Sequence, residues 1–404
     1  MLMNSLRPVL FAAVGFVALF GLIVISLRRG LPHWWRSRAV RWALAFLVGS
    51  TVIGLSIWLG GSVARYRGVS AVGIHSLWIL LAFILPLTFA LVVAGVFWRV
   101  ASFALLRKPA TAEATTARSK ISRRAVVQWG TAAIPATALA ASTSGLVSAR
   151  SEPTLSTLPM RFAKLPPDLE GLRILQLTDL HLGPYRKVSD LEWVLAQATR
   201  TKPDLIVFTG DIADDLAMLG PALRLAAEQK PRLGVFASVG NHEYFRSITQ
   251  VRRIVDASPV ALLLDHGASI PVGSSTLYIA GADDPARSGG GFGGDVDGFL
   301  TRSVDRALDG APSDAFHLML SHRPDGFVAS SARGVDLTLS GHTHGGQVGL
   351  FGRSAFEPIW PGKYLRGEYV RGGSRLYTSA GFGHWFPFRL NCAPEAPTIV
   401  LARA

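Results

Sequence analysis

The sequence has 404 residues, of which 49% are hydrophobic, and a formal net charge of +14. Residues 1–150 contain 16 Lys and Arg but only one acidic residue, Glu113, whereas residues 151–404 contain 25 Lys and Arg and 26 Asp and Glu. Because the basic excess lies in the apolar part, it indicates membrane topology, and we expect no nucleic-acid partner. The single cysteine, Cys392, excludes an intrachain disulfide and a cysteine-based zinc site.

Residues 1–110 contain three apolar segments, 8–27, 42–60 and 77–98, and none of them includes a charged residue. Each is long enough to cross a hydrocarbon core of about 30 Å as a helix. Five arginines lie between the first two segments, two lie between the second and third, and seven basic residues follow the third. The positive-inside rule therefore predicts a multi-pass region of the cytoplasmic membrane, with the first and third loops in the cytoplasm.

Residues 111–150 combine a basic linker with a fourth, weaker apolar segment, 125–147. The stretch "SRRAVVQW" resembles a twin-arginine translocation signal in which Arg123 and Arg124 are the paired arginines. It departs from that pattern because it is internal and because Gln128 replaces the usual lysine. A final transmembrane helix with a basic cytoplasmic flank is the alternative. Both interpretations place the chain from about residue 150 onward on the extracytoplasmic side.

Residues 151–404 show the pattern of an α/β domain. From Gly171 onward, short β-rich runs such as "LRILQLTD" and "DLIVFTGD" alternate with helix-like segments. Between these two runs, Ser189 and Glu192 have the spacing of a capping box at the start of an amphipathic helix. The early order is therefore strand, helix, strand.

Polar residues that can bind metals follow several of these runs. They are Asp179 and His181, Asp211, Asn241 and His242, His322, and His342 and His344. Because the carboxyl ends of strands in an open α/β sheet meet in one crevice, residues far apart in the sequence can come together there. His342 and His344 would point the same way in an extended segment, and the glycines around them let the backbone approach closely.

The order of these motifs resembles the signature of calcineurin-like metallophosphoesterases. Here the motifs read "TDLHLG", "TGDIADD", "VGNHEYF", "LSHRPDGF" and "SGHTHGGQ", and the resemblance extends from about residue 165 to 401. The nearest resemblance is to the compact, membrane-anchored bacterial members of the family. It implies a four-layer αββα sandwich, with two mixed sheets between outer helices, preceded here by an all-α transmembrane region.

The resemblance also implies a binuclear metal centre. Asp179, His181 and His344 would bind the first metal ion, Asn241, His322 and His342 the second, and Asp211 would bridge the two. Oxygen and imidazole ligands without thiolate fit two divalent ions of Mn, Fe or Zn. Such a pair activates a shared water for attack on phosphorus. His242 matches the family histidine that protonates the leaving oxygen, and Glu243 is expected to support the ligands.

Two further segments bear on the substrate. Residues 286–299 are too rich in glycine for regular structure, and we expect either a mobile loop near the site or a flexible connector. Residues 382–389 place His384, Trp385 and two phenylalanines beside Arg389. They form either ordinary aromatic packing or an apolar wall for a lipid-like substrate, with Arg389 or Arg323 contacting its phosphate.

These observations predict a membrane-anchored dimetal phosphohydrolase that acts on phosphodiester or pyrophosphate bonds. Its phosphoester substrate would come from lipid or envelope material if the aromatic segment forms a substrate wall. The alternative is a membrane protein whose metal-binding domain senses a phosphorylated ligand without turnover. Neither interpretation sets the oligomeric state.

Overall fold

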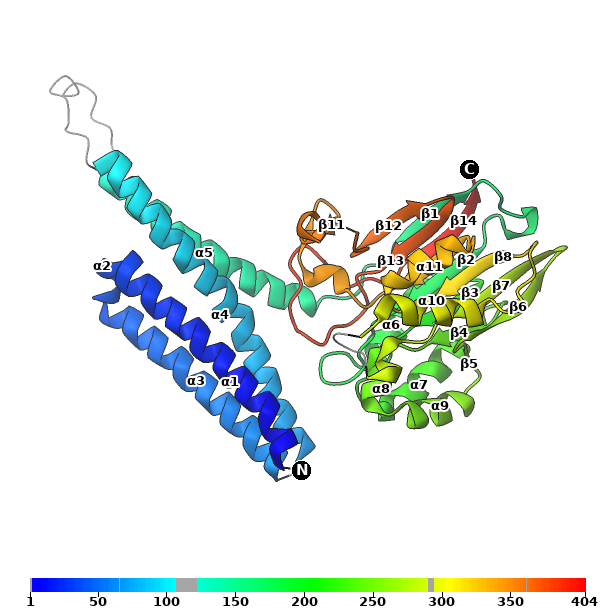
Figure 1. Ribbon diagram of the computed structural model, residues 1–404, viewed down its shortest axis with the longest axis horizontal. Helices are drawn as coiled ribbons and strands as arrows, with labels where there is room; N and C mark the ends of the chain where they lie inside the picture. Colours follow the sequence, from blue (N-terminus) through cyan, green and yellow to red (C-terminus); the bar gives the residue numbers. More distant parts are fainter. Residues whose placement is uncertain (1, 65, 107–121, 290–293, 361) are drawn as a thin grey trace, which may run out of the picture. The chain divides into compact units, whose positions relative to one another are not determined.

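The computed structural model describes residues 2–64, 66–106, 122–289, 294–360 and 362–404 (Figure 1). The chain divides into two compact units, Met1–Leu146 and Val147–Ala404. The basic residues at 107, 108, 118 and 120, on which part of the predicted topology rests, lie outside the described residues. Each unit is described below by itself.

The first unit is helical. Its long helices are α1 (Leu2–Ile25), α3 (Arg38–Val63), α4 (Arg67–Ala101) and α5 (Arg123–Ala149), whose last turn belongs to the second unit; α2 (Pro32–Trp35) is short. Four helices of the described chain are long and apolar enough to cross a membrane. α3 and α4 approach closely, because a Cβ on Gly61 would lie 2.3 Å from the Ser70 nitrogen and one on Gly73 would lie 2.4 Å from the Trp58 nitrogen. Small residues at such crossings allow close helix packing in lipid.

The second unit contains two six-stranded mixed sheets. The first has the order β1 (Thr157–Phe162), β14 (Thr398–Arg403), β2 (Arg173–Leu177), β3 (Leu205–Thr209), β4 (Val235–Ser238), β5 (Ala261–Leu262). The second has the order β12 (Gly367–Arg371), β13 (Ser374–Thr378), β9 (Leu337–Ser340), β8 (Phe316–Leu320), β7 (Ser275–Gly281), β6 (His266–Val272). Each sheet contains a run of parallel strands, β2 to β5 in the first and β13 to β7 in the second. In the first sheet the parallel pair β1 and β14 joins β2 in antiparallel orientation, and in the second sheet β12 and β6 are antiparallel edge strands.

Side-chain alternation along the strands builds the layers. Ile174 and Val207 point into a core shared with Leu318 and Leu339 of the second sheet, whereas Phe208 points to the opposite face. That opposite face is covered by α6 (Val188–Ala198), α7 (Leu216–Ala227) and α9 (Ile248–Asp256). The outer face of the second sheet is covered by α10 (Val296–Ala307) and α11 (Phe327–Ala332) (Figure 1). The predicted four-layer αββα sandwich is confirmed.

Two local predictions were wrong. α6 begins at Val188, and the side chain of Asp190, not of Glu192, accepts the backbone N–H of Lys187 at 2.7 Å. The glycine-rich segment is regular at both ends, since a 3-10 turn covers Pro285–Ser288 and α10 begins at Val296, while residues 290–293 lie outside the described part. Gly289 follows the 3-10 turn as its C-cap and Gly298 lies in the first turn of α10, so glycine does not prevent helix formation at either end of the segment.

Candidate metal centre

The predicted site residues follow five strands, three from the first sheet and two from the second. Asp179 and His181 follow β2, Asp211 follows β3, and Asn241 begins α8 (Asn241–Arg246) shortly after β4. His322 follows β8, and His342 and His344 follow β9. Strands β2, β3 and β4 are neighbours in one sheet, and β8 and β9 are neighbours in the other. The carboxyl ends of both sheets therefore contribute to one site.

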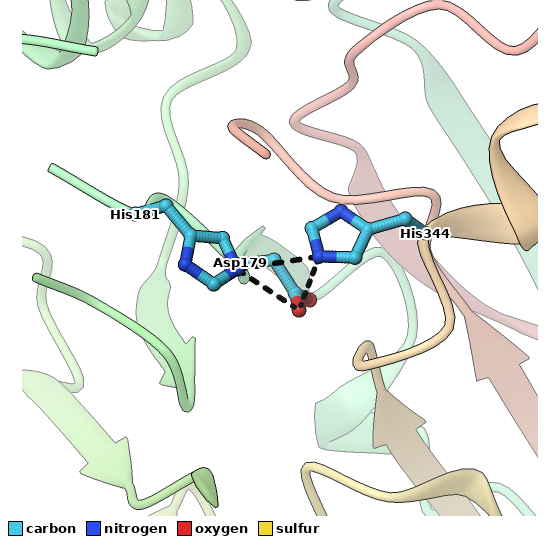
Figure 2. A group of neighbouring side chains, drawn as sticks. All are labelled: Asp179, His181 and His344. Atoms are coloured by element: carbon cyan, nitrogen blue, oxygen red, sulfur yellow. Dashed lines mark hydrogen bonds and ion pairs between the residues drawn. The ribbon is translucent and has the colours of Figure 1, made fainter. Parts of the chain in front are cut away.

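Asp179, His181 and His344 form the first group of side chains, and they point toward one another (Figure 2). Nε2 of His181 lies 3.2 Å from Nε2 of His344. Oδ1 of Asp179 lies 3.4 Å from Nε2 of His344 and 4.0 Å from Nε2 of His181. All three residues are buried, so the group is removed from bulk water.

Asp211, His322 and His342 form the second group. Oδ2 of Asp211 lies 3.3 Å from Nε2 of His322, which in turn lies 3.2 Å from Nδ1 of His342. The same carboxylate oxygen lies 3.7 Å from Nε2 of His181 in the first group. Asp211 is therefore placed between the two groups, where a bridging ligand must lie. Asn241 is buried beside it, and its Oδ1 accepts no hydrogen bond from any described residue.

The ring tautomers leave lone pairs that face carboxylates. Nδ1 of His322 lies 2.8 Å from the Thr209 carbonyl, which can only accept, so this nitrogen carries the proton. Nδ1 of His181 likewise faces the carboxylate of Asp214 at 3.3 Å. In the neutral rings, Nε2 of both histidines is then an unprotonated nitrogen aimed at Asp211. This arrangement needs a proton or a metal cation between the groups, and with the orphaned oxygen of Asn241 it fits divalent metal ions.

The electrostatics of the two groups also favour positive charge. Burial alone would lower the pKa of His322, but the carboxylates of Asp211 and Asp179 outweigh it and raise that pKa to about 10. Burial instead lowers the pKa of His342 and His344 well below the usual histidine value, which keeps both rings neutral. Neutral imidazole is the form that binds metal.

The backbone is strained where the metal-capable side chains attach. Five of them have positive φ values: Asp179 51°, His181 46°, Asp211 51°, His342 67° and His344 49°. This region is uncommon for residues other than glycine, and such strain collects at functional sites. The surrounding structure must therefore hold these turns in place, which orients the side chains before any ligand binds.

Glycines allow the carboxylates to approach the backbone. A Cβ on Gly341 would lie 2.0 Å from Oδ2 of Asp179, and a Cβ on Gly240 would lie 2.3 Å from Oδ1 of Asp211. Real Cβ atoms do not approach other atoms so closely, so any side chain at either position would displace a carboxylate of the site.

Glu243 fixes the turn that carries Asp211, as expected of a supporting residue. Its carboxylate is buried and accepts backbone N–H groups from Asp211 at 2.9 Å, Ile212 at 2.8 Å and Gly240 at 2.7 Å. It therefore joins the turn after β3 to the turn after β4. All three hydrogen bonds are from backbone donors, which indicates a structural role.

His242 lies at the edge of the site and is held by a residue that sequence reasoning missed. Its Nδ1 is 2.6 Å from Oδ1 of Asp214, which also receives Nη2 of Arg246 at 2.9 Å. Burial opposes ionisation of Asp214, but hydrogen bonds from His181 and His242 hold its pKa well below the usual value. Burial also opposes protonation of His242, yet Asp211 and Asp214 raise its pKa to about 8. The available signal for Asp214 was its place in "TGDIADD", three residues after Asp211.

The two groups open into a cavity of about 480 Å³. Its lining includes Asp211, Asn241, His342 and His344, together with His242, Arg323 and the partly exposed aromatic residues Phe245 and Trp385. The aromatic segment at 382–389 is thus divided: Trp385 faces the cavity, whereas Phe388 is packed in the interior. One face of the cavity is polar, and part of its rim is apolar.

The prediction that Arg389 contacts phosphate is wrong. Arg389 is fully buried, and it donates to the carbonyls of Ala380, Gly381, Gly383 and Cys392. Arg323 lines the cavity instead, with Nε held 2.8 Å from the buried carboxylate of Asp284. Nη2 of Arg389 also lies 3.2 Å from Nδ1 of His344, so this guanidinium contacts a site residue from the interior of the domain, whereas that of Arg323 lines the cavity.

Comparison with known proteins gives consistent matches. The family model described as calcineurin-like phosphoesterase matches residues 172–346. A transmembrane protein with a metallophosphoesterase domain from Danio rerio is 30% identical over 64% of this chain and 60% of its own length. The metallophosphoesterase YkuE of Bacillus subtilis is 31% identical over 59% of this chain and 81% of its own length.

A solved structure, the calcineurin-like phosphoesterase YfkN from Bacillus subtilis, is similar over 52% of this chain and 82% of that chain, with 12% identity and a TM-score of 0.37. The sequence matches cover the strands and turns that carry the site, and the chain spans less than two thirds of the length of the Danio rerio relative. On the family match and the extent of the Bacillus subtilis relative, the chain belongs to the calcineurin-like phosphoesterase family.

Proposed function

We propose that this protein is a membrane-anchored dimetal phosphohydrolase that cleaves phosphodiester or pyrophosphate bonds. The observation that carries the proposal is the pair of histidine and carboxylate groups that share Asp211, with Nε2 of His181 and His322 directed at that carboxylate. His242 and Arg323 line the same cavity and add a proton donor and a cation. Membership of a fold family does not establish catalysis by itself, so the proposal that the protein turns over substrate rests on these site residues.

We assign the ligands as follows. Asp179, His181 and His344 hold one divalent ion, Asn241, His322 and His342 hold the other, and Asp211 contacts both. Nitrogen and oxygen ligands without thiolate suit Mn, Fe or Zn. When bound, the two ions supply Lewis-acid activation of water and neutralise charge on the phosphoryl group.

His242 is assigned as the proton donor to the leaving oxygen. Because Asp214 holds Nδ1, the ring can rotate little, and Nε2 is the nitrogen left for substrate. A pKa of about 8 keeps this ring protonated near neutral pH, which suits a general acid. Asp214 is a positioning residue, since it holds His242 and His181 in one orientation.

Arg323 is assigned to bind phosphoryl oxygens. Asp284 accepts Nε at 2.8 Å and Nη2 at 3.4 Å, so the guanidinium is oriented before substrate arrives. Arg323 lines the cavity together with the second group of ligands. A guanidinium held in this way matches the geometry of phosphate oxygens.

We also propose that the metal-binding domain lies on the extracytoplasmic side of the cytoplasmic membrane. The support is the asymmetry of basic residues around the apolar segments and the presence of helices long enough to cross a membrane. Arg123 and Arg124 begin the last of these helices, where the twin-arginine pair of an export signal would stand.

The full-length protein, stripped of metal in detergent and reloaded with Mn²⁺, is predicted to retain two equivalents of Mn²⁺ per chain after dialysis. His322→Ala should retain one, because it removes a ligand from only one group. Mass spectrometry of the metal content measures both values. The control is His317→Ala, since His317 lies on β8, the strand that precedes His322, and its Nε2 contacts the Pro312 carbonyl. Two equivalents in His322→Ala would contradict the ligand assignment.

The metal-loaded protein is predicted to hydrolyse bis-p-nitrophenyl phosphate, and His242→Ala should lower kcat by about 10²- to 10⁴-fold without loss of metal. Release of p-nitrophenol measures turnover, and p-nitrophenyl phosphate tests monoesterase action. The matched control is His266→Ala, because His266 is an exposed histidine of β6. A fully metal-loaded protein that turns over neither ester would indicate a binding or sensing domain instead of an enzyme.

Arg323→Ala is expected to lower kcat/KM for the diester by about 10- to 100-fold, the usual loss for a hydrogen bond to a charged group. Arg323→Lys should recover part of it, because the charge remains but the fork of donors is lost. Steady-state kinetics with Arg302→Ala, an exposed arginine of α10, provide the comparison. Unchanged kinetics in Arg323→Ala would rule out the phosphate contact.

Replacement of Arg123 and Arg124 by lysines tests the export signal, because the charge of the flank and the helix are both retained. If the pair acts as a twin-arginine signal, the domain should remain on the cytoplasmic side. Protease accessibility of the domain in cells with a permeabilised envelope measures its side. Normal export of the lysine variant would show that the last apolar segment acts as an ordinary transmembrane helix.

A further inference from the structure

The hairpin β10 (Gly349–Leu350) and β11 (Arg353–Ser354) ends in an unusual turn. Leu350 pairs with Arg353, so the loop consists of Phe351 and Gly352, with φ values of 49° and 80°. Two positive φ values in a two-residue loop define the turn family that favours Asn-Gly. Phe351 occupies the position at which asparagine adopts a positive φ with less strain, and its side chain is 96% exposed. Neither local conformation nor packing explains this phenylalanine.

Other large apolar side chains are exposed within the same short segment. Leu350, Ile359 and Trp360 are 52%, 73% and 60% exposed, and Ile359 and Trp360 lie at the end of the 3-10 turn Glu357–Ile359. We name Leu350, Phe351, Ile359 and Trp360 the apolar tip. A concentration of such residues on the surface of a folded domain marks a binding surface. Tryptophan and phenylalanine are also typical of the membrane interface.

The base of this hairpin is attached to the rim of the metal cavity. Nε2 of Gln347 donates to the Phe386 carbonyl at 2.8 Å, and the N–H of Gly349 donates to the Leu390 carbonyl at 2.8 Å. Gln347 and Trp385 both line the cavity. The base of the hairpin that carries part of the apolar tip is therefore hydrogen-bonded to residues 382–390, the segment that contributes Trp385 to the cavity lining.

The start of the second unit is attached to that segment as well. Nη2 of Arg186 donates to the carbonyls of Ala149 at 3.2 Å and Ser151 at 2.6 Å, and its Cζ lies 5.6 Å from the centre of the Phe382 ring. Ala149 is the last residue of α5, one of the helices that can cross a membrane. The point where the chain leaves its last apolar helix is thus linked, through Arg186, to the segment that contributes Trp385 to the cavity lining.

We propose that the apolar tip inserts into the interfacial region of the bilayer from which α5 emerges, and that the cavity accepts an amphiphilic phosphoester presented at that surface. The occupant is a bilayer because Gln347, Phe382 and Arg186 link the hairpin of the apolar tip to the end of a helix that is apolar enough to cross a membrane. The substrate class rests on the proposed hydrolase function, whereas the insertion does not. Insertion would bring the phosphates of lipid headgroups to the level of the cavity.

Insertion is tested with the full-length protein in lipid nanodiscs. A single environment-sensitive fluorophore is attached at Phe351→Cys or Trp360→Cys, since Cys392 is fully buried. Lipids that carry a nitroxide near the headgroup should quench both labels. The matched control is Val328→Cys, because Val328 is an exposed apolar residue of α11. Equal, weak quenching at 351 and 328 would overturn the proposal. It would also be overturned if the fluorophore at 351 became shielded from solvent only when two copies of the protein share a nanodisc.

The substrate class is tested with Phe351→Ser, which alters no residue of the cavity. Turnover of soluble bis-p-nitrophenyl phosphate should be unchanged, while turnover of hexadecyl p-nitrophenyl phosphate embedded in nanodiscs should fall several-fold. Equal turnover of the embedded ester by both proteins would overturn the substrate class. Failure of the wild-type protein to hydrolyse either ester would instead refute the hydrolase function, and the quenching result would still decide whether the tip is inserted.

Discussion

The site depends on one buried carboxylate. Glu243 accepts three backbone N–H groups from the turns after β3 and β4, and a buried charge is stable only when it is satisfied in this way. These bonds hold Asp211 in its strained conformation, and Oδ1 of Asp211 then accepts the N–H of His242 at 2.9 Å. His242 is next joined to Asp214, and Asp214 to His181. One unreactive side chain therefore sets the positions of residues on three strand ends.

The sequence was sufficient to predict that the candidate metal-binding side chains meet, because each lies shortly after a strand, whereas their assignment to particular ions came from the family resemblance. The apolar run marks the strand, the polar residue marks its end, and the convergence of carboxyl ends brings Asp179, Asp211 and His322 together without further information. Asp214 could not be predicted in the same way. Its contacts with His181 and His242 depend on side-chain orientations across 28 to 33 residues. The environment of Arg389 could not be predicted from the sequence either. Its hydrogen-bond partners are backbone carbonyl groups, which every residue has, so no residue type in the sequence indicates them.

Hydropathy located the long helices of the first unit but not their ends. The apolar run 77–98 lies inside α4, which extends over Arg67–Ala101. Helical hydrogen bonding continues through flanks such as Arg67 and Arg99, where hydropathy is low, so composition defines only the lipid-compatible centre. The close contact of Gly61 and Gly73 with the opposite helix is a tertiary feature. Glycine content alone does not reveal which glycines face a neighbouring helix.

The proposed ligands of each ion come from both sheets. Asp179 and His181 belong to the first sheet and His344 to the second, and the other group likewise combines Asn241 with His322 and His342. Without ions, the two sheets are joined here by a shared apolar core that includes Val207 and Leu339, and by hydrogen bonds such as that from Nε2 of Gln176 to the Ser340 carbonyl. Ion binding would therefore act as a reversible cross-link between the sheets, and the unfolding equilibrium of the domain would be linked to the concentration of free metal. Metal supply would then set the lifetime of the folded domain as well as the fraction of it that is active.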